Sequence, residues 1–170
     1  MPKLSDSELE AFLEERGVLM RIATVREDGA PAVTPIWFLF EEGAVWFTPR
    51  KHSSWFADLR RDPRVALCID EQPLPYRKVI LEGRAELVFD LGEDDAWRNR
   101  YRRIAGRYVP PEAADAYIED TVDQPRALYR LPLASATVRS WRMPLEGEDR
   151  AGIWHQRYYE SGTKLKRPET

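Results

Sequence analysis

The chain has 170 residues, enough for one ordinary domain and too few for a (β/α)₈ barrel, which needs roughly 250 residues. Apolar residues make up 43% of it and charged residues 32%, a mixture typical of a globular protein and not of a disordered chain. The formal net charge is -3 and both signs are spread along the sequence, so we expect neither nucleic acid nor a membrane surface as a partner.

The first predicted element is a short amphipathic helix that ends before Gly17. The segment Ser5-Asp6-Ser7-Glu8 has the form of a capping box. The apolar residues Leu9, Phe12 and Leu13 follow at helical spacing and form one stripe. Because glycine tolerates the left-handed conformation that ends many helices, Gly17 is predicted to be the C-terminal cap.

Seven apolar segments between turn signals predict β-strands. They cover residues 18–25, 32–40, 44–48, 64–70, 77–88, 127–131 and 136–141. Short turns join the first three, one of them with the hairpin signal Asp28-Gly29, which predicts an antiparallel meander. Pro35 lies inside the second strand and cannot donate to a ladder, so it marks an edge or a bulge. Gly83 is predicted to be a bulge in the fifth strand.

Three further helices are predicted over residues 54–61, 93–107 and 110–117. The fold class is therefore mainly β, with six or seven antiparallel strands and helices inserted between and after them. Such a sheet hides its edges by closing or by pairing with another chain, so we expect a closed or nearly closed barrel. We expect a single domain over residues 1–145 and a charged C-terminal tail over residues 146–170.

The segment from Thr48 to Trp55 is the strongest candidate for a binding site. A strand ends there, the cations Arg50 and Lys51 follow, and Ser53 opens a helix whose first N–H groups are unpaired. Together these groups predict a compact site for phosphate or carboxylate. The alternative is that Ser53 only caps the helix and both cations are solvated.

The segment 33–38 is a second candidate. The interruption at Pro35 leaves backbone groups that could bind a flat heterocycle, with Trp37 packed beside it. The alternative is an ordinary core strand with a bulge.

A basic cluster falls on the predicted helix 93–107. It could meet a phosphate or nucleic acid, but a solvated or interface face is the favoured interpretation. Its members are Arg98, Arg100, Arg102, Arg103 and Arg107.

The remaining chemistry-bearing residues exclude several functions. One cysteine cannot form an internal disulfide, and together with two histidines it cannot furnish a standard structural zinc site. No motif predicts a Ser-His-Asp hydrolase. No apolar run reaches the roughly 20 residues of a membrane-spanning helix, and the N-terminus does not have the pattern of a signal peptide. We therefore expect a cytoplasmic, metal-free protein.

Four groups of residues resemble, in order, segments of the pyridoxamine 5′-phosphate oxidase-like family of FMN-binding split barrels, some of which use a deazaflavin. They are residues 20–25 with 28–31 and 35–38, residues 47–48 with 50–53 and 59–67, residues 79–86, and residues 138–141. The resemblance covers most of residues 18–142, and the order of the motifs is specific although no single motif is.

The resemblance implies a split barrel that forms a homodimer, with a flavin site in each cleft between the subunits. It implies that the cofactor phosphate is held by Arg50, Lys51 and Ser53, and that Thr48 before them also binds the cofactor. It places the ring beside the backbone of Thr34, Pro35, Ile36 and Trp37. It also suggests contributions from Arg77 and, from the partner chain, Trp141.

Trp55 departs from the family pattern. Many family members have a lysine two residues after the loop serine, and an indole cannot replace an ammonium group in holding a phosphate. Either Arg50 and Lys51 carry that charge, or cofactor affinity is reduced, or the pocket takes another ligand. The indole is expected to lie beside the phosphate site; the alternative is that it faces inward into the core with Phe56 or Leu59.

The leading functional hypothesis is an FMN-dependent oxidoreductase that acts on a small-molecule substrate. In such an enzyme the cofactor supplies the redox chemistry, which agrees with the absence of an acid–base constellation in the sequence. The alternatives are a deazaflavin-dependent reductase on the same fold, or a non-enzymatic dimer that binds flavin or haem.

Overall fold

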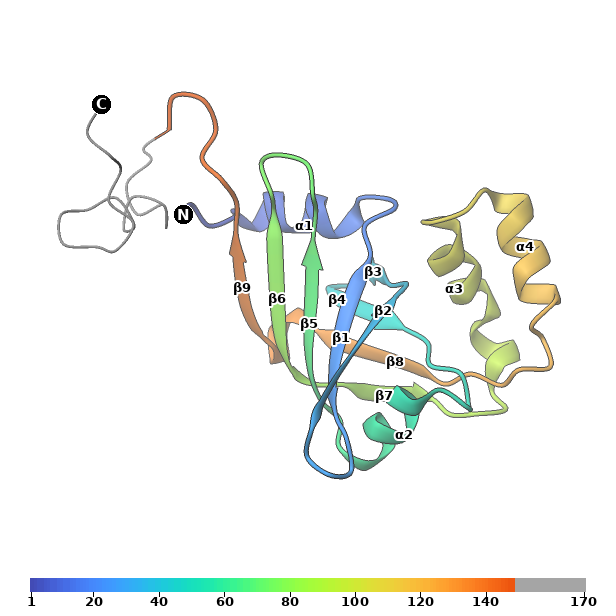
Figure 1. The fold of residues 1–170 in the computed structure, drawn as a ribbon. Helices are drawn as coiled ribbons and strands as arrows, with labels where there is room; N and C mark the ends of the chain where they lie inside the picture. The colour runs from blue at the N-terminus through green and yellow to red at the C-terminus, as the bar shows by residue number, and fades with distance from the viewer. Residues whose placement is uncertain (149–170) are drawn as a thin grey trace, which may run out of the picture.

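The computed structural model describes residues 1–148, which form two antiparallel β-sheets and four α-helices (Figure 1). The helices are α1 (Asp6–Glu14), α2 (Ser54–Arg61), α3 (Asp94–Gly106) and α4 (Pro111–Glu119), with a short 3₁₀ helix, η1 (Leu133–Ser135). The strands are β1 (Met20–Val25), β2 (Pro31–Ile36), β3 (Leu39–Glu41), β4 (Ala44–Phe47), β5 (Arg64–Asp70), β6 (Lys78–Arg84), β7 (Glu86–Phe89), β8 (Leu128–Pro132) and β9 (Thr137–Trp141). The tail predicted over residues 146–170 lies outside the described residues from 149 onward.

The two sheets make a split barrel. One has the strand order β2-β1-β5-β6-β9 and the other β3-β4-β8-β7, and every neighbouring pair is antiparallel. Side chains from both sheets pack into one core, whose fully buried members include Phe12, Phe47 and Leu67. The predicted mainly β architecture with inserted helices is confirmed, and the barrel is open between the sheets.

Residues 1–148 contain nine strands, whereas the sequence predicts at most seven, because two predicted strands each divide between the sheets. The first break follows β2, where the fully buried Phe38 donates its backbone N–H to the Tyr108 hydroxyl at 3.1 Å and not to a strand. Both pairings of the predicted meander are confirmed, β1 with β2 and β3 with β4, but the second predicted strand is not continuous, since β2 and β3 belong to different sheets. The edge position predicted from Pro35 is confirmed, because β2 pairs only with β1.

The second break lies at Ala85, between β6 and β7, where the backbone N–H donates to the Pro63 carbonyl at 2.8 Å. Gly83 is not the predicted bulge, since it pairs in regular register with Val65. It serves close packing between the sheets instead: a Cβ at Gly83 would lie 2.9 Å from Cδ1 of Leu131 on β8.

Helix α1 begins with the predicted capping box. The Ser5 N–H donates to Oε2 of Glu8 at 2.8 Å, and the Glu8 N–H donates to Oγ of Ser5 at 3.3 Å. The helix crosses one end of the five-stranded sheet (Figure 1). Gly17 is not its cap, because the helix ends at Glu14. Gly17 instead forms a turn with φ +80°, and its N–H donates to the carbonyl of Arg107.

Helices α3 and α4 lie side by side at the opposite end of the molecule from β9 (Figure 1). Their apolar faces form a second core with the four-stranded sheet, in which Trp97, Ile104 and Ile118 meet Trp46 of β4 and Leu128 of β8. This second core holds α3 beside the end of β2, where the candidate site lies. Among residues 1–148, no helix combines the length and the apolar character needed to cross a bilayer.

Candidate functional site

A cavity of about 260 Å³ lies where the end of β2, the loop before α2, and α3 meet; we call it the central cavity. Seven of the ten predicted cofactor residues line it, from two separate predicted motifs. The lining residues are Thr34, Pro35, Ile36, Trp37, Thr48, Arg50, Ser53, Trp55, Tyr101, Ile104 and Arg126. The structure therefore brings the predicted phosphate loop and the predicted ring-binding strand to one place.

The loop before α2 is fixed by a long-range backbone pairing. The Lys51 N–H donates to the Pro125 carbonyl at 2.9 Å, and the Ala127 N–H donates to the Pro49 carbonyl at 3.2 Å. Between them, Arg50 and Arg126 form an isolated antiparallel bridge. This pairing places two arginines, far apart in sequence, on the same cavity.

Arg126 is a candidate anion ligand that sequence reasoning missed. Its side chain is buried, with 6% of the residue exposed, and no carboxylate in residues 1–148 lies within 4.0 Å of its guanidinium. Nη1 donates to Oγ1 of Thr48 at 3.4 Å and Nη2 donates to the Tyr117 hydroxyl at 3.3 Å, while Nε has no partner in the part of the chain that the structure describes. A buried cation without a counter-ion is costly, so these groups fit an anion from a ligand.

Arg50 adds a second cation to the cavity. Its Nη2 donates to the Tyr117 hydroxyl, and its guanidinium lies 5.8 Å from the centre of the Tyr117 ring. Burial raises the pKa of Tyr117, but the neighbouring Tyr101 hydroxyl, Arg126 and Arg50 outweigh that effect and hold the pKa below its ordinary value. The cavity wall is therefore strongly electropositive at this end.

Ser53 is the N-cap residue of α2, but its side chain does not cap the helix. Its hydroxyl donates to the Arg50 carbonyl at 2.8 Å, and no side chain among residues 1–148 caps the first N–H groups of the helix. The interpretation of Ser53 as a simple helix cap is therefore wrong. The positive end of α2 stays available beside Arg50 and Arg126.

Lys51 is exposed and does not line the central cavity. It borders an adjoining cavity of about 310 Å³, which shares Arg50 and Ser53 with the central one and also contacts His52 and Gln124. The two cavities meet at the loop, so the basic surface extends from Arg50 outward to Lys51.

Trp37 forms the apolar wall of the central cavity. Its ring stacks on Tyr108 with centroids 5.1 Å apart and planes 5° from parallel, and it meets Tyr117 edge-on at 5.5 Å. Just before it, β2 is an edge strand, so one of its two sides carries unpaired backbone groups. A fixed aromatic wall beside free backbone donors and acceptors suits a planar heterocycle, and the cations suit its phosphate. The residues present fit FMN.

Trp55 is part of the core. Only 8% of it is exposed, and its ring packs against Phe47 with centroids 6.2 Å apart. The expectation that the indole lies outside the core is therefore wrong, although the residue also borders the central cavity. The apolar face of α2 points into the core from its first turn, and the Trp55 and Phe56 side chains are both buried on that face.

Arg77 and Trp141 are not brought to the central cavity. Arg77 forms paired hydrogen bonds with Glu71 and with Glu15, at 2.6 to 2.8 Å, and lies over the Phe12 ring. It ties α1 to the turn between β5 and β6, and the Glu71 and Glu15 carboxylates raise its pKa. Trp141 lies on the edge strand β9, opposite Lys78. Its contribution to a partner's site stays a prediction.

Metal binding has no candidate among residues 1–148, where no group of three or more His, Cys, Asp or Glu side chains could hold an ion. His155, the second histidine, lies outside the described residues.

Comparison with known proteins gives one family. The family model described as pyridoxamine 5′-phosphate oxidase matches residues 5–139. No curated protein matches the chain in sequence.

Several solved structures share the fold. A conserved hypothetical protein of Mycobacterium tuberculosis is 24% identical with a TM-score of 0.67, over 88% of this chain and 95% of its own. An "F420 reductase" is 25% identical with a TM-score of 0.53, over 83% and 96%. The haem storage protein HutZ of Vibrio cholerae is 20% identical with a TM-score of 0.58, over 79% and 94%.

Proposed function

Since the chain belongs to the pyridoxamine 5′-phosphate oxidase family, we propose that it is an oxidoreductase that binds FMN in the central cavity. The observation that carries the proposal is the buried Arg126, a cation without a carboxylate partner in residues 1–148. It lies beside Arg50, near the N-terminus of α2, whose first N–H groups have no side-chain cap among these residues. A phosphate there would compensate two positive charges that the described residues leave open. The proposed enzyme is cytoplasmic and acts on a small molecule.

Each part of the cavity has a separate task in this proposal. Arg50, Arg126 and Thr48 hold the phosphate, Ser53 turns its hydroxyl to it from the Arg50 carbonyl, and Lys51 adds charge from the adjoining cavity. The backbone of residues 34–37 holds the ring edge, and the Trp37 indole keeps water from one side of it. Bound FMN supplies hydride and electron transfer, so the chain itself needs to position and shield the reactants.

The site is proposed to be completed by a second copy of the chain. The central cavity, at about 260 Å³, is smaller than the roughly 300–1,000 Å³ typical of small-molecule sites. Next to it, Val33 on the edge strand β2 is 65% exposed. A twofold dimer would cover this edge and enlarge the cavity into a cleft between subunits.

We expect the purified protein to have the mass of a dimer at micromolar concentration when measured by light scattering. Replacing Val33 with glutamate should place like charges at the proposed contact and shift the mass toward that of a monomer. Val122, 60% exposed and far from β2 in sequence, provides the matched control as Val122→Glu. A monomeric wild-type protein would contradict the dimer.

A deazaflavin is the second candidate cofactor. The adjoining cavity extends the basic surface from Arg50 to Lys51 and His52, which suits a cofactor with a longer anionic tail. Haem binding without catalysis is the third candidate, and His52 is the one histidine among residues 1–148 that could serve it.

The absorption spectrum of the purified protein distinguishes these cofactors, since flavin, deazaflavin and haem have different bands. We expect flavin bands, and FMN titration should show that Arg50→Ala weakens binding by about 10- to 100-fold, because a charge-assisted bond contributes about 1.5–3 kcal/mol. Lys51→Ala should weaken it less, because Lys51 is exposed and outside the central cavity. Unchanged affinity in Arg50→Ala would place the phosphate elsewhere.

A further inference from the structure

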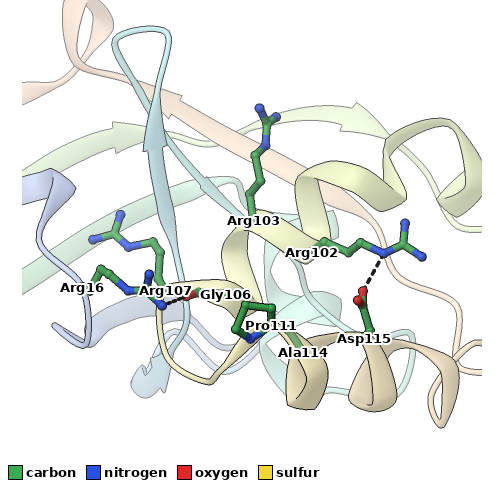
Figure 2. A pocket seen from close by; sticks show the side chains of 8 residues that line it. All are labelled: Arg16, Arg102, Arg103, Gly106, Arg107, Pro111, Ala114 and Asp115. Atoms are coloured by element: carbon green, nitrogen blue, oxygen red, sulfur yellow. Dashed lines mark hydrogen bonds and ion pairs between the residues drawn. The ribbon is translucent and has the colours of Figure 1, made fainter.

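A second hollow, of about 460 Å³, lies on the other side of α3 from the central cavity. Four arginines border it: Arg16 from the turn after α1, Arg102 and Arg103 from α3, and Arg107 just after α3. Figure 2 shows Arg16 and Arg107 at one side of the hollow and Arg102 at the other, with Pro111 and Ala114 of α4 between them. The basic cluster predicted from the sequence therefore contributes three of these side chains.

Two of the four arginines are neutralised by carboxylates. Nε of Arg102 lies 2.9 Å from Oδ1 of Asp115, and Nη1 of Arg103 lies 2.7 Å from Oε1 of Glu41. For the rest of the cluster on α3 the same holds, since Arg98 pairs with Asp95 and Arg100 with Glu41 and Glu42. A mostly paired, partly solvated face is what the favoured interpretation of the sequence expects.

Arg16 and Arg107 are different. Within residues 1–148, neither guanidinium has a carboxylate within 4.0 Å, and both donate only to neutral backbone carbonyls. Arg16 donates to the Gly106 carbonyl, and Arg107 donates to the carbonyls of Leu13, at 2.8 Å, and Glu15. Two guanidinium groups at one side of the hollow therefore have no direct ion pair in the described part of the chain, and only the more distant Glu14 carboxylate acts on Arg107.

The position of Arg107 makes this charge unusual. Only 7% of the residue is exposed, its guanidinium lies over the Phe38 ring at 4.3 Å, and its Nε is buried without a partner among the described residues. Burial lowers its pKa from the ordinary value. A cation held in this way is expensive unless an anion approaches it.

The wall between the arginines is apolar. Pro111 and the buried Ala114 form one wall, and Gly106 leaves open space, since a Cβ built there meets no heavy atom within 4 Å. The one carboxylate among the lining residues, Asp115, lies at the far side and is paired with Arg102. A volume of about 460 Å³ lies within the roughly 300–1,000 Å³ of small-molecule sites. We propose that this hollow binds a small organic anion, with a carboxylate or phosphate group at Arg16 and Arg107 and an apolar body against Pro111 and Ala114.

The proposed site is separate from the central cavity and does not rest on the proposed function. On α3, Tyr101 and Ile104 line the central cavity, whereas Arg102, Arg103 and Gly106 line the hollow. The helical repeat places these two sets on different faces. Both sites can therefore be filled at the same time.

Phenyl phosphate, which joins a phosphate to an apolar ring, is the probe for the test. It is titrated into the full-length chain with excess FMN present, and backbone amide shifts are followed by nuclear magnetic resonance. We expect saturable shifts at Gly106, Arg107 and Ala114. Phenol, without the charge, and inorganic phosphate, without the ring, should each bind at least tenfold more weakly.

Two variants test the two halves of the site. Arg16→Gln removes an exposed cation and should weaken phenyl phosphate about tenfold. Gly106→Met fills the open space without changing charge and should weaken it by a similar factor, while the better helix former preserves α3. Arg26→Gln, an exposed arginine in the turn between β1 and β2, is the control and should leave the affinity within twofold.

The proposal would be overturned by the absence of saturable shifts at Gly106 and Arg107, by wild-type affinity in both Arg16→Gln and Gly106→Met, or by equal loss of affinity in Arg26→Gln. Loss of phenyl phosphate binding in Arg50→Gln but not in Arg16→Gln would assign the probe to the central cavity, and would likewise overturn it. Failure of FMN to bind leaves these readouts intact, since they come from residues outside the central cavity.

Discussion

Replacing Trp55 with lysine is expected to lower the free energy of unfolding by about 3 kcal/mol or more, with no gain in FMN affinity. The indole is 8% exposed and packs against Phe47 in the main core, so the substitution removes a large apolar contact and buries an ammonium group. Urea unfolding measures the stability, and FMN titration measures the binding.

Trp55→Phe is the matched control, because it retains an aromatic ring in the same core position. It should lose less than half as much stability as Trp55→Lys. If the added lysine instead tightened FMN binding at unchanged stability, the indole would have to lie outside the core, as the sequence alone suggested, and the assignment made here would be wrong.

The lesson of Trp55 is that a family position does not fix the direction of a side chain. From sequence, the residue two places after the loop serine looks like a ligand position that has lost its lysine. In the structure the same position lies on the inward face of α2, where Trp55, Phe56 and Leu59 are all buried. Helical periodicity over residues 54–61 predicts that Trp55 shares a face with Phe56 and Leu59, whereas the family resemblance favours a ligand position.

Local patterns predicted the secondary structure well, because period and turn chemistry are properties of short segments. Strand β5 begins and ends where it was predicted, and so does α2. The breaks at Phe38 and Ala85 were not predictable in the same way. Each is decided by a hydrogen bond to a distant residue, the Tyr108 hydroxyl and the Pro63 carbonyl, while the apolar pattern continues through it.

The same distinction, between local sequence patterns and contacts with distant residues, applies to the candidate site. The loop 48–53 and the segment 34–37 could be predicted as candidates because the residues of each are contiguous in sequence, and residues of both line the central cavity. Arg77 was expected at the site, but two carboxylates that sequence reasoning did not connect with it, Glu15 and Glu71, hold it elsewhere. Arg126 was missed because only the pairing of residues 49–51 with 125–127 brings it to Arg50. Its one sequence signal is a cation directly before a predicted apolar strand.

Arg126→Met is expected to weaken FMN by at least about 100-fold without lowering the stability of the FMN-free protein. The variant removes a buried cation that would form charge-assisted hydrogen bonds to the phosphate, worth about 1.5–3 kcal/mol each. In the FMN-free protein the same cation has no carboxylate partner among residues 1–148, and replacing an uncompensated buried charge with an apolar chain of similar length is often neutral or stabilising. Arg50 still donates to the Tyr117 hydroxyl, so that group keeps a partner.

Arg130→Met, on strand β8 directly after the Arg126 segment, is the control for this variant. The Arg130 guanidinium pairs with Glu86 at 2.8 Å, is more exposed, and does not line the central cavity, so its loss should leave FMN affinity within a few-fold of the wild type. Weaker FMN binding without a loss of stability indicates a residue that serves the ligand and not the fold. Equal FMN affinity in the two variants, or a loss of more than about 2 kcal/mol of stability in Arg126→Met alone, would show that Arg126 is structural. The phosphate would then have to be held by Arg50 and the N-terminus of α2.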